Sequence, residues 1–197
     1  VDGALNQKVG RPLKVALEQR GYTITSLRVL NDTVASLLGG VHLYSEPRFG
    51  QNYIGLILGT GTNMAGVFPL ARLSKVESFT SASMVVNLES GNYAPPHLTA
   101  HDDKVDEKSN NPGFQRFEKA VSGHYLPYLF NEIHPGVINP EEGTGKLVEL
   151  RDSSEGPGAQ TAGLILHRSA QLAAAGLVGL ASLYPPGDTA VLGEGTL

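Results

Sequence analysis

The sequence contains no cysteine and no tryptophan, and no uninterrupted apolar stretch is long enough to cross a bilayer. The lack of cysteine excludes disulfides, zinc–thiolate sites and thiol nucleophiles, although it does not fix the compartment. We see no pattern of a secretory leader in the sequence. We therefore expect a soluble, cytoplasmic protein that does not bind membranes.

A strong charge of either sign is also missing, since 19 acidic residues stand against 15 basic ones and give a net charge of -4. This balance offers no basic surface for nucleic acid or for an acidic membrane. With 197 residues, the chain can form one sizeable core, or one domain and part of another. It begins with Val1 and stops where a strand-and-turn pattern starts, so we expect a fragment. The oligomeric state cannot be predicted from these features.

The most informative stretch is residues 53–63, in which an apolar run of strand length meets a Gly-Thr-Gly-Thr turn. A second apolar stretch follows over residues 64–70, so the pattern predicts a β-hairpin. The N–H groups of such a turn can bind an anion, and glycines let a ligand approach closely. An ordinary tight hairpin is the alternative. The spacing matches neither common phosphate loop, because Met64 replaces the third glycine of the dinucleotide fingerprint and no Gly-Lys-Ser/Thr follows.

The rest of the chain alternates predicted helices and strands, which favours an α/β or α+β class. Residues 12–20 predict a helix, residues 23–30 a strand, and a short helix after Asn31 ends at the glycine pair 39–40. A strand is expected at 83–89 and loops at 90–109. A helix opening at 111–112 and kinked at Pro127 should continue to about residue 134. Loops at 136–160, a helix at 162–183 and a strand at 189–192 complete the pattern.

Two carboxylates stand at the ends of predicted strands. Asp32 follows a predicted strand, where it can cap a helix or face a cleft as a general base. Glu89 ends an otherwise apolar strand, which is an unfavourable place for a charge without a purpose. By contrast, we interpret the His/Asp-rich stretch 97–103 as a solvated loop, since the region lacks helical periodicity.

Five ordered motifs across residues 29–197 resemble the hexokinase family. They are Val-Leu-Asn-Asp-Thr-Val (29–34), Gly-Thr-Gly-Thr-Asn (59–63), Val-Asn-Leu-Glu (86–89), Asn-Pro-Gly-Phe-Gln-Arg-Phe-Glu-Lys (111–119) and Glu-Gly-Thr-Leu (194–197). The resemblance implies an actin-like ATPase, ribonuclease-H-like fold of class α/β, and the large domain of a two-domain sugar kinase. Residues 1–30 would be the tail of the small domain with the hinge, and residues 31–197 an incomplete large domain.

The resemblance also implies a reaction: transfer of the γ-phosphate of ATP, with Mg²⁺, to the 6-hydroxyl of a glucose-like hexose, as in glycolysis. Asp32 would be the catalytic base. The expected sugar-binding residues are Asn31, Asn63, Glu89 and Glu118. The expected nucleotide-binding residues are Gly59, Thr60, Gly61, Thr62, Gly195 and Thr196. No protein ligand for a metal is expected. A hexokinase-like sugar-binding or regulatory protein without turnover is the alternative, since a fold and a site can persist when chemistry is lost.

Overall fold

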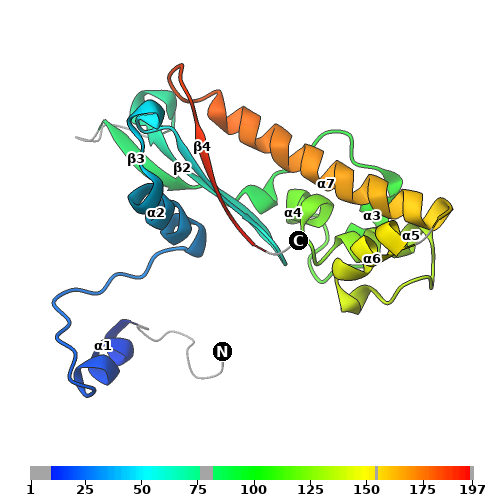
Figure 1. Cartoon of the computed structure of the whole chain (residues 1–197), viewed down its shortest axis with the longest axis horizontal. Helices are drawn as coiled ribbons and strands as arrows, with labels where there is room; N and C mark the ends of the chain where they lie inside the picture. Colours follow the sequence, from blue (N-terminus) through cyan, green and yellow to red (C-terminus); the bar gives the residue numbers. More distant parts are fainter. Residues whose placement is uncertain (1–9, 76–81, 154, 196–197) are drawn as a thin grey trace. The chain divides into compact units, whose positions relative to one another are not determined.

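The structure is a computed structural model that describes residues 10–75, 82–153 and 155–195 (Figure 1). The chain divides into two units, residues 1–32 and residues 33–197. The first unit contains helix α1 (Gly10–Glu18). The strand predicted at 23–30 is wrong: these residues are irregular, and Val29 and Leu30 are 72% and 53% exposed. Their β-propensity has no effect because no strand in the described part of the chain pairs with them.

The second unit is built on a four-stranded sheet of order β3-β2-β1-β4. The strands are β1 (Tyr53–Leu58), β2 (Thr62–Pro69), β3 (Ser83–Asn87) and β4 (Ala190–Glu194). The pairs β1–β2 and β2–β3 are antiparallel, whereas β1 and β4 are parallel. The predicted hairpin and the strands near 83–89 and 189–192 are thereby confirmed.

Helix α2 (Asp32–Tyr44) covers one face of this sheet, where Leu37 packs with Tyr53 and Ala65. The prediction that it ends at the glycine pair 39–40 is wrong. A Cβ on Gly40 would lie 2.5 Å from Cδ1 of Leu192 in β4, so this glycine permits close packing instead of stopping the helix.

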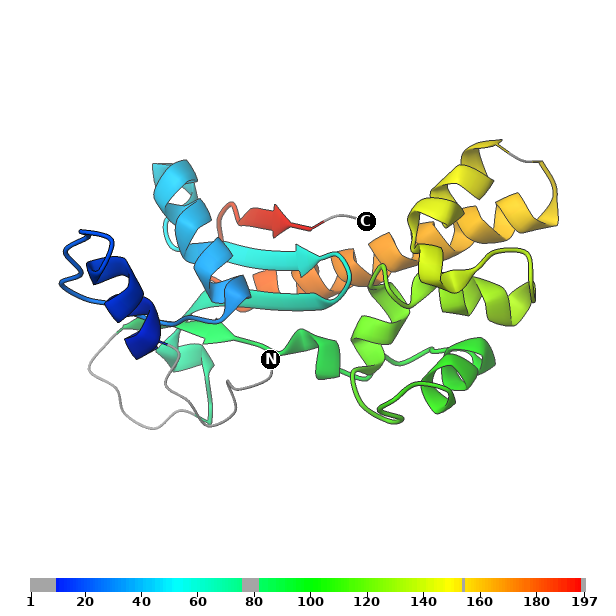
Figure 2. The ribbon, with the colours of Figure 1, turned by 90° about the horizontal axis from the view of Figure 1, so that it is seen from below.

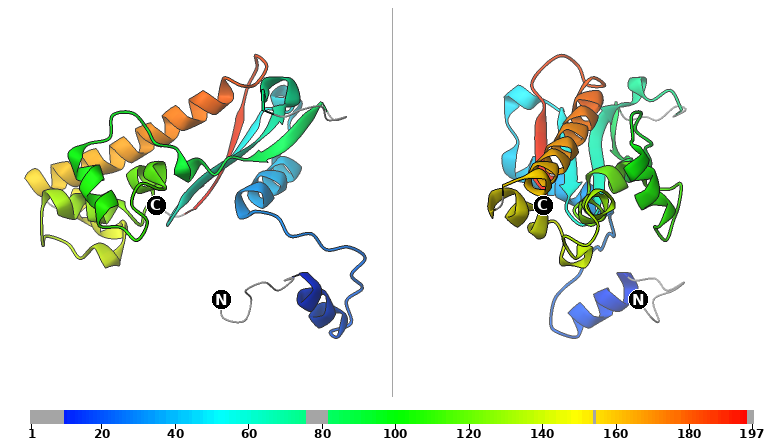
Figure 3. Two further views of the ribbon diagram at one scale, coloured as in Figure 1. Left: turned by 180° about the vertical axis from the view of Figure 1, so that it is seen from behind. Right: turned by 90° about the vertical axis from the view of Figure 1, so that its right-hand side faces the viewer.

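The opposite face is covered by helix α7 (Pro157–Ala181) and helix α4 (Arg116–Val121), as Figures 2 and 3 show. The small-residue helix predicted at 162–183 is confirmed. Among the described residues, α7 is the one helix with the length and apolar composition of a membrane span. Side chains of α7 pack in several cores, including those around Met64 and Ile54, and this packing accounts for part of its apolar character.

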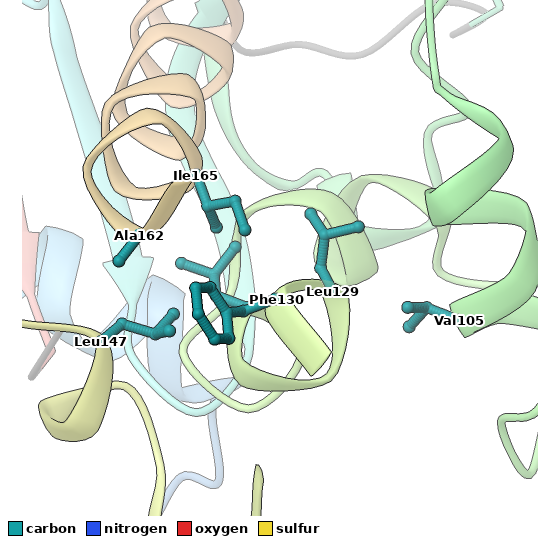
Figure 4. Close-up of a cluster of buried hydrophobic side chains, with 7 residues drawn as sticks. Val105, Leu129, Phe130, Leu147, Ala162 and Ile165 are labelled. Atoms are coloured by element: carbon teal, nitrogen blue, oxygen red, sulfur yellow. The ribbon is translucent and has the colours of Figure 1, made fainter. Parts of the chain in front are cut away.

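Beyond the sheet, the other end of α7 packs with α3 (Ala100–Glu107), α5 (Leu126–Ile133) and α6 (Gly145–Ser153). Figure 4 shows their shared core around Phe130. The loops predicted at 90–109 and 136–160 therefore contain α3 and α6, and both predictions are wrong. Short 3₁₀ turns complete the unit: Pro47–Phe49 (η1), Leu70–Arg72 (η2), Ser90–Asn92 (η3) and Pro140–Glu142 (η4).

Helix α3 forms in the polar stretch because its charges are paired. Thr99 and Asp102 make a capping box, and Asp102 also binds the guanidinium of Arg168 in α7, with Nη1 2.9 Å from Oδ1. Burial opposes ionisation of Asp102, but the bonds from Thr99 and Arg168 outweigh it and lower its pKa. Asp106 in turn pairs with Lys119 at 2.6 Å and with Arg116 at 2.9 Å, both on α4.

The single kinked helix predicted from residue 111 is instead two helices, α4 and α5. Helix α4 begins only at Arg116, because the preceding Gln115 has a left-handed backbone (φ 52°). The break at residues 122–125 precedes Pro127, which lies in the first turn of α5. In this break the N–H groups of Gly123 and His124 donate to Gly59 and Thr60. The break between α4 and α5 thus allows the backbone of Gly123 and His124 to bond the hairpin turn.

Candidate functional site

Most of the predicted site residues of the second unit meet at one end of the sheet. The β1–β2 turn, the end of β3 and the end of β4 lie there, because β1 and β4 are parallel and β3 runs antiparallel to β2. Helix α4 reaches the same place through its contacts with η3 and β2. This end of the sheet, with the turn at 59–62, is called the site edge below.

The turn itself is fixed from both sides. Gly59 N–H donates to Gly61 O (3.0 Å), and Gly59 O accepts from Gly123 N–H (2.7 Å). The buried Thr62 hydroxyl donates to Ile57 O at 2.9 Å, so it holds the hairpin closed. The N–H groups of Thr60 and Gly61 have no acceptor within the described part of the chain. Two backbone donors of the turn are therefore available to an anion.

Glu118 lies directly under this turn. Its Oε2 accepts from Thr62 N–H at 2.9 Å. A Cβ on Gly61 would come within 2.7 Å of the same oxygen, so only glycine fits there without displacing the carboxylate. Gly91 of η3 also lies against Glu118, with an ideal Cβ position 3.3 Å from the Cβ of that residue. The structure thus brings the predicted Glu118 against the predicted turn.

Asn63 and Glu89 are joined by a residue that the sequence analysis did not select. The Nδ2 of Asn63 donates to Oδ1 of Asn87 (2.7 Å), and the Nδ2 of Asn87 donates to Oε1 of Glu89 (2.6 Å). The Oδ1 of Asn63 also accepts from the N–H groups of Met64 and Ser90. The period-2 alternation of β3 was a possible signal, since it places residues 87 and 89 on one face.

Glu89 has an unusual backbone for a non-glycine residue, with φ 49° and ψ 45°. Left-handed geometry costs free energy and persists where surrounding contacts impose it, often at functional sites. Here the bonds of Asn63 to Ser90 and of Asn87 to Glu89 supply those contacts. The side chain of Glu89 is exposed, so its second oxygen can accept from a ligand.

At the end of β4, Gly195 approaches the turn very closely. It has φ 138°, and a Cβ there would lie 2.2 Å from Leu58 O. Only glycine is compatible with that position. The neighbouring Glu194 accepts a hydrogen bond from Ser36 of α2. Thr196, the other predicted residue of this motif, lies outside the described residues.

The remaining predicted residues belong to the first unit. Asn31 precedes α2 and Asp32 is its first residue, and both are exposed. That these two residues lie beside Asn63 and Glu89 stays a prediction. Within the described ranges no group of three acidic, His or Cys residues could hold a metal ion. The stretch 97–103 is partly helical, and its Asp102 and Asp103 are paired with arginines.

Comparison with known proteins identifies the family. A family model described as Hexokinase matches residues 53–152, which is 100 of the 197 residues. The chain belongs to the hexokinase family. Hexokinase-7 of Oryza sativa subsp. japonica is 37% identical over 137 residues, covering 68% of this chain and 28% of that protein. Glucokinase of Aspergillus niger is 32% identical over 145 residues, covering 68% of this chain and 29% of that protein.

Solved hexokinase structures show the same fold. A hexokinase from Schistosoma mansoni complexed with glucose matches 99% of this chain and 60% of its own, with a TM-score of 0.69 and 20% identity. A further hexokinase crystal structure matches 95% of this chain and 48% of its own, with a TM-score of 0.70 and 27% identity. The predicted actin-like α/β fold is confirmed. The chain spans less than a third of the length of the curated relatives named above.

Proposed function

We propose that the protein to which this chain belongs transfers the γ-phosphoryl group of ATP to the 6-hydroxyl of a hexose such as glucose. The observation that carries the proposal is the site edge, where hydroxyl-binding side chains and an anion-binding turn lie together. On one side is the bonded series Asn63–Asn87–Glu89, and on the other are the turn 59–62 and Glu118. Membership of the hexokinase family supports it.

On the acceptor side, the hydrogen-bonding capacity still available decides what each residue can do. Asn63 uses its Oδ1 for two backbone N–H groups and one Nδ2 proton for Asn87, which leaves one proton for a sugar oxygen. Glu89 uses one oxygen for Asn87 and keeps the other for a sugar hydroxyl. Such a set favours a polyhydroxylated ligand, because each missing hydroxyl would leave one of these polar groups without its partner.

On the donor side, the N–H groups of Thr60 and Gly61 would bind phosphate oxygens, while Gly195 and Thr196 would contact the adenosine end. Mg²⁺ neutralises phosphate charge when it is bound with ATP. Such an ion would be held mainly by phosphate oxygens and water. Thr62 would act through the shape of the turn, since its hydroxyl is already donated to Ile57 O.

In the transfer step, the 6-hydroxyl oxygen forms a bond to the γ-phosphorus while the bond from that phosphorus to the β,γ-bridging oxygen breaks, and ADP leaves. We assign the hydroxyl proton to the carboxylate of Asp32, with Asn31 holding the sugar beside it. Residues 1–30 would then be the tail of the small domain and the hinge. We also propose that the protein is cytoplasmic.

The test is Asp32→Ala in the intact protein. Removing a general base typically lowers the rate by ~10²–10⁴, so phosphorylation should be abolished while glucose affinity stays within about tenfold. Coupled assays across a panel of hexoses measure the rate, and calorimetry measures binding. Near-normal turnover in the variant would remove Asp32 from the role of base. Glucose binding without phosphorylation of any hexose would favour the non-catalytic sugar-binding alternative.

A further inference from the structure

The side of the hairpin opposite to Asn63 and Asn87 carries a pocket that the proposed reaction does not use. Side chains alternate along a strand, so Met64 and Leu88 point away from the hexose-binding residues beside them. With Phe117 of α4 and the helix α7, they enclose about 640 Å³. This volume is in the usual range for small-molecule sites, roughly 300–1,000 Å³.

The lining of this pocket is almost entirely apolar. Helix α7 contributes Ala175, Gly176 and Gly179, which keep the space open because they carry almost no side chain. A Cβ on Gly179 would meet no atom within 4 Å. Tyr93 stands at the rim, 59% exposed, with its ring centroid 6.4 Å from that of Phe117. No Asp, Glu, Lys or Arg lines the pocket, and its one histidine, His97, is exposed, so a charged ligand would lose hydration without finding a buried counter-ion.

One lining residue, Ser90, carries a polar atom without a partner. The hydroxyl oxygen of Ser90 is buried and has no hydrogen-bond partner among the described residues. A buried hydroxyl left unpaired is unfavourable, and a ligand that supplies a donor or acceptor removes that cost. A buried orphan hydroxyl in an apolar pocket of this size fits a compact neutral ligand with a ring or alkyl body and one hydroxyl.

The position of Ser90 connects the pocket to the hexose site. Its N–H donates to Oδ1 of Asn63 (3.1 Å), and it directly follows the left-handed Glu89. A ligand bonded to the Ser90 hydroxyl would therefore act on the two residues proposed to hold the sugar. We propose that this pocket, called the Ser90 pocket, is a second ligand site for a neutral, mainly apolar molecule with one hydroxyl, and that its occupant changes hexose affinity. The effect on hexose affinity rests on the proposed function.

Binding can be measured without any catalysis, because the chain has two methionines and only Met64 lines the pocket. With ¹³C-methyl-methionine labelling, phenol should shift the Met64 signal saturably, while Met84 in β3 serves as the internal reference. Ser90→Ala should weaken phenol about five- to tenfold, the usual effect of one hydrogen bond. The same substitution should leave the affinity for benzene, which has no hydroxyl, unchanged.

Gly179→Leu should fill the pocket and abolish the phenol-dependent shift. Gly163→Leu is the matched control, because it lies on the same helix outside the pocket lining and should leave the shift intact. A folded chain with no saturable Met64 shift, or an equal shift in Gly179→Leu, would overturn the binding site.

The coupling is measured separately in the intact protein, as the glucose dissociation constant with and without saturating phenol. We expect a change of at least threefold that disappears in Gly179→Leu. An unchanged constant despite a saturable Met64 shift would overturn the coupling. If the intact protein bound no glucose at all, the proposed function would fail, whereas the Met64 titration would still decide whether the pocket binds its ligand.

Discussion

The role of Asn87 became visible only in the structure. Its side chain bonds two residues that are predicted to bind the hexose, Asn63 and Glu89, although Asn87 itself is not predicted to contact the sugar. Asn87→Ala in the intact protein should remove the bonds to Asn63 and Glu89. A hydrogen bond to a charged group contributes about 1.5–3 kcal/mol, so we expect KM for glucose to rise roughly tenfold to a hundredfold, with a smaller change in kcat.

The control for this substitution is Asn131→Ala, which removes an asparagine that bonds a backbone N–H of Gly136. It should leave KM unchanged. Asn87→Asp should be as damaging as Asn87→Ala, because it keeps the acceptor for Asn63 but places a second carboxylate beside Glu89. Steady-state kinetics at several glucose concentrations decide the matter. A normal KM in Asn87→Ala would mean that Asn63 and Glu89 need no such positioning.

At the residue scale, the sequence predicted which positions belong to the site but not the hydrogen-bond partners that hold them there. The motifs placed Gly59–Thr62, Glu118 and Gly195 together only through family resemblance, and the structure supplies the contacts. Thr62 illustrates what the sequence could not show: its hydroxyl is donated inward to Ile57 O. Hydrogen-bond partners far apart in the chain, such as Thr62 and Glu118, depend on the tertiary fold, and neither spacing nor propensity encodes them.

At the scale of elements, the glycine pair in α2 gives a matched test of why the helix continues. Gly39→Ala should stabilise the protein by up to about 1 kcal/mol, since alanine is the better helix former and a Cβ there meets nothing. Gly40→Ala brings a Cβ within 3.0 Å of Cγ of Leu192, and such overpacking typically costs ~1–3 kcal/mol. Urea unfolding should rank Gly40→Ala below Gly39→Ala, and equal stabilities would contradict close packing as the reason for glycine at position 40.

Elements with a strong apolar period were predictable, and elements defined by tertiary contacts were not. The hairpin and α7 follow from pattern alone. Helix α3 was missed because its sequence is as polar as that of a typical loop. Its charges are paired through a capping box and Arg168, and the sequence does not show this pairing. The segment 23–30 was misassigned for the opposite reason: it has the residues of a strand, but none of the described strands pairs with it.

At the scale of the whole molecule, Tyr184 predicts how stability changes at alkaline pH. Its side chain is 5% exposed, and its hydroxyl donates to Tyr53 O. Burial raises the pKa of Tyr184 to about 12, although a hydrogen bond from the backbone partly offsets this. Below pH 10 the Tyr184 hydroxyl is protonated in both the folded and the unfolded states. Between pH 10 and 12 Tyr184 ionises only in the unfolded state, so the free energy of unfolding should fall by roughly 2–3 kcal/mol.

Tyr184→Phe should remove that alkaline loss, at a cost of about 1 kcal/mol at neutral pH for the missing hydrogen bond. Tyr22→Phe, which changes an exposed tyrosine of the first unit, should keep the wild-type pH dependence. Urea unfolding at a series of pH values from 8 to 12 provides the comparison. Parallel pH profiles for the wild type and Tyr184→Phe would show that ionisation of this residue is not linked to folding.

The last prediction concerns the kinase activity of the 197-residue chain by itself. In-line phosphoryl transfer depends on closing a site around both substrates, which excludes water and completes the catalytic groups. This chain spans about 28% of the rice hexokinase-7 that it matches, and Glu89 at its site edge is exposed. Hydrogen bonds there contribute little net binding, since water competes for each of them. We therefore expect residues 1–197, shown to be folded by circular dichroism, to release no more ADP with glucose than their Asp32→Ala variant. Turnover clearly above that control would show that this part of the hexokinase fold already contains a sufficient active site.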